Sequence, residues 1–263
     1  MQDSRIRLTI RTGNDALSFS VGNPQSERKI VYEPYHVKNG ISIAANLREA
    51  FNESELLQTG YRKVLILTDT PVMLVPTDEF DENNVEMLYE HTFTGQEGSL
   101  IVHSVLPTLN AVAAFAVNKD LKLVVDDHFE DIRFIPSIQP VWQHLHRRNG
   151  AGPRQKLFTY FHEKRMEVFC FTQNRFKFYN SYDATYIQDA LYYLLYAWKQ
   201  LGFHAENDEL HIVGQTEHKD WMTEQLHQYL QRVYSISPAA DFNRPVGSLE
   251  NRIPYDLLAL YLD

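Results

Sequence analysis

Cysteine and long apolar segments are scarce in this chain of 263 residues. The single cysteine, Cys170, has no partner for an internal disulfide, and its apolar setting in Val168–Phe171 favours a buried core thiol in a reducing compartment. The longest uninterrupted apolar run, Ala190–Trp198, is far shorter than the roughly 20 residues that span a bilayer. The first residues also lack the apolar stretch of a secretory signal. We therefore expect a cytoplasmic protein without direct membrane insertion.

Basic residues are outnumbered, since 25 lysines and arginines face 34 aspartates and glutamates. The net charge of -9 opposes binding to a polyanion, so nucleic acid is not an expected partner. The densest basic stretch is His144–Arg148, and arginines at a helix end complement the helix dipole. We interpret this stretch as the end of a helix rather than as a binding patch.

The usual signatures of hydrolases and metal sites are missing as well. The sequence contains no P-loop and no Gly-x-Ser-x-Gly elbow. The apolar neighbours of Cys170 do not favour a reactive thiolate. His144 and His146 lie two residues apart, where helical side chains diverge, so they do not indicate a zinc site. The sequence thus favours no catalytic residue and no metal ligand.

One acidic cluster, Asp126–Asp131, could hold a divalent cation or serve a nuclease of the ribonuclease H type. Such a nuclease needs a carboxylate in the middle of its first strand. Thr9 and Thr159 occupy the corresponding strands of this chain. We favour a solvated helix end for the cluster, with cation binding as the alternative.

Aromatic residues are abundant, with 15 tyrosines, 15 phenylalanines and 3 tryptophans. Because each buried ring removes on the order of 150–250 Å² from water, the chain can build a sizeable core. Its length exceeds a typical single domain and predicts roughly two lobes. The clearest linker is Asn149–Pro153. We therefore predict lobes over residues 1–149 and 154–263.

Hydrophobic periodicity predicts a similar order of elements in both halves. In the first half we expect strands over 5–11, 17–21, 29–37, 64–67, 72–75, 100–106, 109–117 and 132–135, and helices over 43–56, 80–93, 119–128 and around 141–145. In the second half we expect strands over 157–162, 168–171, 176–179 and 210–213, a helix capped by Asp183 that runs to Leu201, and helices over 220–233 and 253–262. Three strands, a helix, a strand and a helix in each half indicate an internal duplication.

This order resembles the duplicated ribonuclease H-like unit of actin-like ATPases. The segments Val64–Leu67, Val72–Pro76, Ala111–Leu121 and Phe129–Ile132 are similar to those of the pilus-assembly and cell-division branch, with its related secretion scaffold. The chain also resembles a family of uncharacterised bacterial proteins assigned this fold. The resemblance implies an α/β protein with two ribonuclease H-like lobes in an actin-like arrangement and a small inserted subdomain in the first lobe, at about residues 70–106.

The loops that give the family its chemistry differ here. In the first phosphate loop, Thr9 and Arg11 stand where the resemblance implies an aspartate and a glycine. The second loop, Tyr160–Arg165, has no glycine, and of the adenosine-binding pair only Gly214 remains. These departures argue against ATP turnover. The candidate residues of the interlobe cleft are Thr9, Arg11, Thr12, Gly13, His162, Lys164, Gly214 and Gln215.

We accordingly expect a non-enzymatic scaffold or adaptor with a degenerate nucleotide cleft, no cofactor and another protein as its partner. The alternative is an atypical ATP- or phospho-ligand-binding protein, or an ATPase, that uses the interlobe cleft. In that alternative, phosphate contacts come from Arg11, Thr12, Gly13 and Lys164.

The long helix of the second lobe has two distinct faces at roughly 100° per residue. Its core face comprises Ile187, Ala190, Leu191, Leu194, Leu195 and Trp198. Tyr192 and Tyr196 point away from that face. They either pack under another layer of the protein or form a partner patch, because contiguous exposed aromatic side chains mark interfaces.

Overall fold

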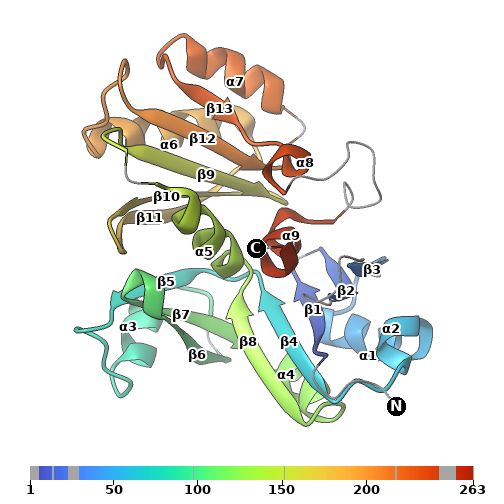
Figure 1. Cartoon of the computed structure of the whole chain (residues 1–263). Helices are drawn as coiled ribbons and strands as arrows, with labels where there is room; N and C mark the ends of the chain where they lie inside the picture. Colours follow the sequence, from blue (N-terminus) through green and yellow to red (C-terminus); the bar gives the residue numbers. More distant parts are fainter. Residues whose placement is uncertain are drawn as a thin grey trace. The chain divides into compact units, whose positions relative to one another are not determined.

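The computed structural model describes residues 6–13, 15–22, 30–96, 98–150, 152–216, 218–242 and 253–262, and its elements are drawn in Figure 1. The chain divides into two compact units. The first runs to Val141 and includes Leu260–Leu262, and the second comprises Trp142–Ala259. Each unit contains its own five-stranded sheet.

The sheet of the first unit has the strand order β3-β2-β1-β4-β8. Its strands are β1 (Leu8–Thr12), β2 (Leu17–Val21), β3 (Val31–Tyr35), β4 (Lys63–Thr68) and β8 (Asp131–Pro136), accompanied by helices α1 (Ile43–Glu53), α2 (Glu55–Gln58) and α4 (Lys119–Asp126). β1, β2 and β3 are antiparallel, whereas β1, β4 and β8 are parallel. Alternate side chains of β1, such as Leu8 and Ile10, pack with Leu47 of α1 and Val124 of α4 in one core.

Two helices of this unit end earlier than predicted. The helix expected over 43–56 is interrupted at Ser54, whose hydroxyl accepts a hydrogen bond from the Leu57 backbone N–H and begins α2. The helix expected to reach residue 128 ends at Asp126. A serine that bonds to the backbone offers an alternative to continued helix, which apolar periodicity alone does not detect.

A separate three-stranded sheet, in the order β5-β7-β6, belongs to the same unit. It comprises β5 (Val72–Pro76), β6 (Ser99–Leu106) and β7 (Ala111–Asn118), with helix α3 (Val85–Thr92) and the 3₁₀ turn η1 (Pro107–Leu109). The predicted insertion therefore ended too early, because β7 pairs with β5 and β6 and not with the main sheet. An unbroken apolar run is typical both of a central antiparallel strand and of a buried parallel one, so the run in β7 does not show which sheet the strand belongs to.

α3 begins five residues later than the predicted helix. The Asp81 carboxylate accepts a hydrogen bond from the Asn83 backbone N–H at 2.9 Å and bonds to the side chain of Asn84. This local bonding holds residues 81–84 in a turn, which competes with the helix.

The second unit repeats the topology of the first, with the strand order β11-β10-β9-β12-β13. Its strands are β9 (Lys156–His162), β10 (Arg165–Thr172), β11 (Arg175–Asp183), β12 (Glu209–Gly214) and β13 (Val233–Ser235). Its helical segments are α6 (Ile187–Gln200), α7 (Lys219–His227) and α8 (Pro238–Asp241), while α5 (Gln139–Arg148) and α9 (Tyr255–Leu262) contain the boundaries between the units. In both sheets the first strand lies at the centre, flanked by the second and fourth, as the predicted duplication requires.

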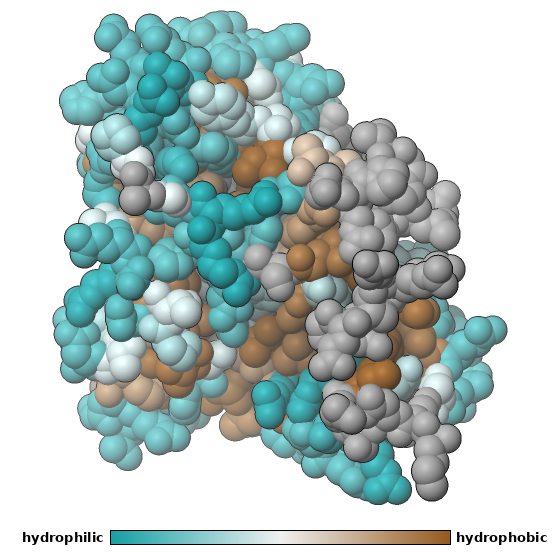
Figure 2. All heavy atoms as spheres, viewed as in Figure 1, coloured by the Kyte–Doolittle hydropathy of each residue, from teal (hydrophilic) through white to brown (hydrophobic). Residues whose placement is uncertain are grey.

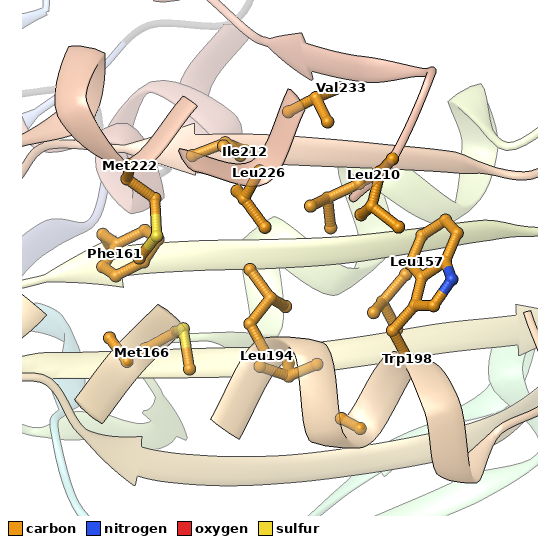
Figure 3. Close-up of a cluster of buried hydrophobic side chains, with 14 of the residues drawn as sticks. Leu157, Phe161, Met166, Leu194, Trp198, Leu210, Ile212, Met222, Leu226 and Val233 are labelled. Atoms are coloured by element: carbon orange, nitrogen blue, oxygen red, sulfur yellow. The ribbon is translucent and has the colours of Figure 1, made fainter. Parts of the chain in front are cut away.

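The core of the second unit lies between this sheet and helices α6 and α7 (Figure 3). Leu157 and Leu210 extend from neighbouring strands toward Leu194 of α6 and Leu226 of α7. The predicted core face of α6 is therefore confirmed. On another part of the sheet, the Trp142 ring meets two β11 rings edge-on, those of Phe176 and Tyr179, at centroid distances of 5.1 and 4.9 Å.

Three boundaries in this unit differ from those expected. Asp183 ends β11 rather than capping α6, and its carboxylate accepts from the Thr185 backbone N–H. α7 ends at His227, and Val233 begins the short strand β13. The apolar spacing of Leu226, Leu230 and Val233 continues past the helix end, which explains the overlong prediction. Among the described residues, no helix has both the length and the apolar character needed to cross a bilayer.

Gly214 ends β12 in a conformation that favours glycine, with a φ of +87°. A Cβ atom there would lie 2.1 Å from the carbonyl oxygen of Phe161 and 2.9 Å from the ring of Tyr160. Both neighbours belong to β9, which pairs with β12 in parallel. Close packing between these two strands is therefore sufficient reason for a glycine at this position.

Gly214→Ala should destabilise the protein more than Gly202→Ala. Gly202 also has a positive φ of +70°, but its Cβ position has no atom within 4 Å, so that substitution adds only backbone strain of about 1–3 kcal/mol. Gly214→Ala adds the clash with β9, and we expect a free energy of unfolding lower by at least about 1 kcal/mol than that of Gly202→Ala. Urea denaturation of both variants measures the difference. Equal losses would contradict the packing argument.

Cys170 should react slowly with thiol reagents in the folded protein. The side chain is 1% exposed, and burial raises the pKa of its thiol to about 11. Because the thiolate is the reactive form, a higher pKa leaves less of it at pH 8, and we expect labelling at least about 100-fold slower than in denaturant. The absorbance change of a disulfide reagent measures both rates. Rapid labelling of the folded chain would show that Cys170 is accessible.

Candidate functional site

The parallel strands of the first unit bring several polar residues together at their carboxyl ends. β1 ends at Thr12, β4 at Thr68 and β8 at Pro136, and these three residues lie side by side in register. Asp69 follows β4, is 8% exposed and donates its backbone N–H to the Thr12 carbonyl at 3.0 Å. Open α/β sheets bind their ligands at this edge. Sequence analysis missed Asp69, although an aspartate directly after a buried strand was a usable signal.

The predicted residues of the first hairpin are engaged by their own chain. Thr9, Arg11 and Thr12 are all buried. The Thr12 hydroxyl donates to the Leu67 carbonyl at 3.2 Å, and the Gly13 backbone N–H donates to the Ala16 carbonyl at 2.8 Å. The first of these contacts holds β1 against β4, and the second closes the β1–β2 turn.

Tyr261, in the last turn of α9, packs on this hairpin. Its hydroxyl lies 3.0 Å from the Ser20 hydroxyl and is also hydrogen-bonded to Thr9. Burial raises the pKa of Tyr261 to about 12. Gly22 lies under the ring, since a Cβ on that glycine would be 2.2 Å from it. The side of β1 and β2 that carries Thr9 is thus covered by a phenol ring.

In the second unit, the β9–β10 hairpin turns without glycine. Glu163 takes the left-handed backbone conformation, with a φ of +50°. Lys164 is exposed, and its carbonyl accepts from the Ala184 backbone N–H at 2.7 Å. His162 is buried and stacks on Tyr160 with ring centroids 4.8 Å apart. Side chains therefore occupy the positions where the resemblance implies a small, open loop.

A buried carboxylate, Glu167, lies beside His162. Glu167 is 2% exposed, and its oxygens accept from the Tyr179 hydroxyl at 2.9 Å and the Ser181 hydroxyl at 3.1 Å. The His162 Nε2 atom lies 3.3 Å away, and the Arg165 guanidinium lies at 3.5 Å. Donors from β9, β10 and β11 thus replace the water that the carboxylate loses on burial. This cluster was not predicted from the sequence. The one indication of it was an acidic residue inside the apolar strand β10.

The ends of β9 and β12 bring three of the candidates together. Gly214 packs against Phe161, the residue before His162, and the Gln215 backbone N–H donates to the Phe161 carbonyl at 3.1 Å. Lys219 points its ammonium at the Gly214 carbonyl, 3.5 Å away, and burial lowers the pKa of this lysine. His162, Gly214 and Gln215 are therefore neighbours, whereas Lys164 lies apart at the turn.

Tyr192 and Tyr196, the residues predicted as a partner patch, are both exposed. Tyr192 is 62% exposed and Tyr196 50%, and their rings stack with centroids 6.1 Å apart. Tyr193 beside them stacks on Tyr182 of β11 at 4.9 Å. By contrast, the surface over α7 is mostly hydrophilic (Figure 2).

The remaining candidates are engaged in local contacts. In the acidic cluster, Asp126 pairs with Lys122 at 2.5 Å and Asp131 with Arg7 at 2.6 Å. The Nε2 atom of His144 lies 2.8 Å from Asp241. That of His146 lies 3.0 Å from the carbonyl of Gln173.

The solved structures with similar folds include two with a TM-score above 0.5. The first is a crystal structure from Bacteroides thetaiotaomicron VPI-5482, described as a protein with actin-like ATPase fold and unknown function. It is 26% identical with a TM-score of 0.84, and the alignment covers 98% of this chain and 95% of that one. The second is described as the PilM-PilN type IV pilus biogenesis complex, at 12% identity and a TM-score of 0.60, with 97% of each chain covered. The predicted actin-like fold is thereby confirmed, and the structure from the pilus system shares that fold.

No curated protein matches the chain. One family model matches residues 1–233, and it carries the description "Protein of unknown function (DUF3822)". Since the match extends over most of the chain, the protein belongs to the DUF3822 family.

Proposed function

We propose that this actin-like protein is a non-enzymatic scaffold or adaptor that works through protein contacts. The observation that carries the proposal is that both candidate phosphate loops are filled by their own chain. Nucleotide chemistry needs backbone that a phosphate can approach closely and a carboxylate that holds metal-bound water. Neither hairpin offers this combination.

In the first hairpin, Thr9 has no charge with which to hold a metal, and Tyr261 already binds its hydroxyl. Arg11 replaces the small residue that close approach would require. In the second hairpin, the oxygens of the buried carboxylate Glu167 are occupied by Tyr179 and Ser181. Displacing these donors would leave buried polar groups without partners, which costs about 1–3 kcal/mol for each group.

Protein partners are supported by one structural neighbour and one surface. The neighbour from the pilus system is described as a complex of two proteins. On this chain, we propose Tyr192 and Tyr196 as the contact surface, because both are exposed and contiguous exposed aromatic side chains mark interfaces.

The alternative function, binding of ATP or another phospho-ligand, is favoured by one observation. Asp69 is a buried carboxylate at the sheet edge where ligands bind in this class of fold. It could supply the metal-binding oxygen that Thr9 lacks, while phosphate contacts would come from Arg11, Thr12, Gly13 and Lys164.

A nucleotide titration distinguishes the two functions. A ligand that binds only the folded state adds about 2.7 kcal/mol at 100 times its dissociation constant. For a dissociation constant of about 10 µM, 1 mM ATP with Mg²⁺ would therefore raise Tm by roughly 5–10 °C. We expect a change below about 1 °C, measured by differential scanning fluorimetry.

Asp69→Asn is the matched control for that titration. If the wild type is stabilised by MgATP and Asp69→Asn removes the effect, the scaffold proposal is wrong and the alternative is supported. If neither protein responds, the filled hairpins account for the result.

A further inference from the structure

The exposed face of α6 carries an ordered set of side chains. Its members are Asp189, Tyr192, Tyr193, Tyr196 and Lys199. At about 100° per residue they fall within an arc of roughly 120°, opposite the core face. This part of α6 is therefore a continuous surface of aromatic rings with one charge near each end.

The rings on this face hold one another in place. Tyr192 stacks on Tyr196 with an interplanar angle of 19°, and it meets Tyr193 edge-on at 5.5 Å. Tyr193 in turn stacks on Tyr182 of β11. Since the rings are already ordered by these contacts, a partner would not have to immobilise them, which lowers the entropic cost of binding.

The spacing of the face matches a two-helix seam. Asp189, Tyr192, Tyr196 and Lys199 are separated by three, four and three residues, the alternation found at the contact positions of paired helices. The tyrosines are also placed symmetrically about Leu194, and the two charges at equal distances from it are opposite. The acidic and basic residues lie five positions to either side of it, and the two tyrosines lie two positions to either side.

We infer that the partner on this face is a second copy of the chain, with α6 packed antiparallel against α6 of the copy. This inference rests on the proposed use of the tyrosine surface for protein contact. In the antiparallel pair, Asp189 meets Lys199 of the partner subunit, and Tyr192 meets Tyr196 of the partner subunit. A two-fold axis repeats each contact, as an isologous interface requires.

The two charges are available for this pairing. Asp189 and Lys199 are exposed, and within the described part of the chain neither side chain forms an ion pair. An acidic first turn and a basic last turn also suit the helix dipole, but the dipole does not require them to share a face with the tyrosines.

One pair of helices gives a small interface. α6 has 14 residues and is about 21 Å long, so the pair falls in the weak class that buries less than about 1,200 Å². We therefore expect a reversible monomer–dimer equilibrium. Sedimentation equilibrium of the full chain up to about 500 µM, at low and at physiological salt, covers the range of such complexes.

The decisive experiment exchanges the charges. Asp189→Lys places two basic residues at each end of the seam, and Lys199→Glu places two acidic ones there. Each variant alone should dimerise at least about 10-fold more weakly than the wild type. Mixed in equal amounts, the two variants should associate again, because every contact then joins opposite charges. Glu224→Lys, at an exposed position of α7, should leave the equilibrium unchanged.

The tyrosines have a matched control of their own. The double variant Tyr192→Ser, Tyr196→Ser should abolish the dimer, whereas Tyr229→Ser removes another exposed tyrosine, 59% exposed, and should not. Thermal melting of each variant checks that it remains folded. The mixing experiment also separates loss of the seam from loss of helix stability, because a destabilised helix is not repaired by mixing.

A monomer at every concentration would overturn this inference, as would a dimer that Asp189→Lys leaves intact. Either result leaves the scaffold proposal to its own test, the response to MgATP. Conversely, a dimer that is stabilised by MgATP would keep the α6 seam and reject the scaffold proposal.

Discussion

The hydrogen bonding of one buried carboxylate determines much of what the second unit can do. Glu167 is tolerated inside the sheet because Tyr179 and Ser181 donate to it and His162 lies against it. These contacts join side chains of β9, β10 and β11. In the first unit, Tyr261 plays a comparable part by bonding to Ser20. In both units, internal side-chain contacts occupy the hairpin where phosphate binding would need an accessible loop. The proposed scaffold function rests on these contacts.

Much of the fold could be predicted from the sequence, because alternation and helical periodicity report burial directly. β1 and β2 and the core face of α6 were predicted in this way. An inserted subdomain was predicted, but the place of β7 in its sheet was missed because the apolar run of β7 has no period. The break at Ser54 was missed because a side chain, not a hydrophobic pattern, ends the helix. Predictions failed where local hydrogen bonds or strand pairing, rather than hydrophobic periodicity, determine the structure.

The candidate site was harder to predict than the fold. Absent residues, such as the missing glycine of the second loop, could be seen in the sequence, but what fills the space could not. Glu167 meets donors from three strands, and Tyr261 reaches β1 and β2 from more than 200 positions away in the chain. Gly214 illustrates the opposite error, because a glycine expected for adenosine is already required by the packing of β12 against Phe161.

We propose that this protein does not bind MgATP. Equilibrium dialysis against radiolabelled ATP with Mg²⁺ tests this proposal most directly. We expect equal label on both sides of the membrane at ATP concentrations up to about 1 mM. Saturable retention of one ATP per chain would contradict it.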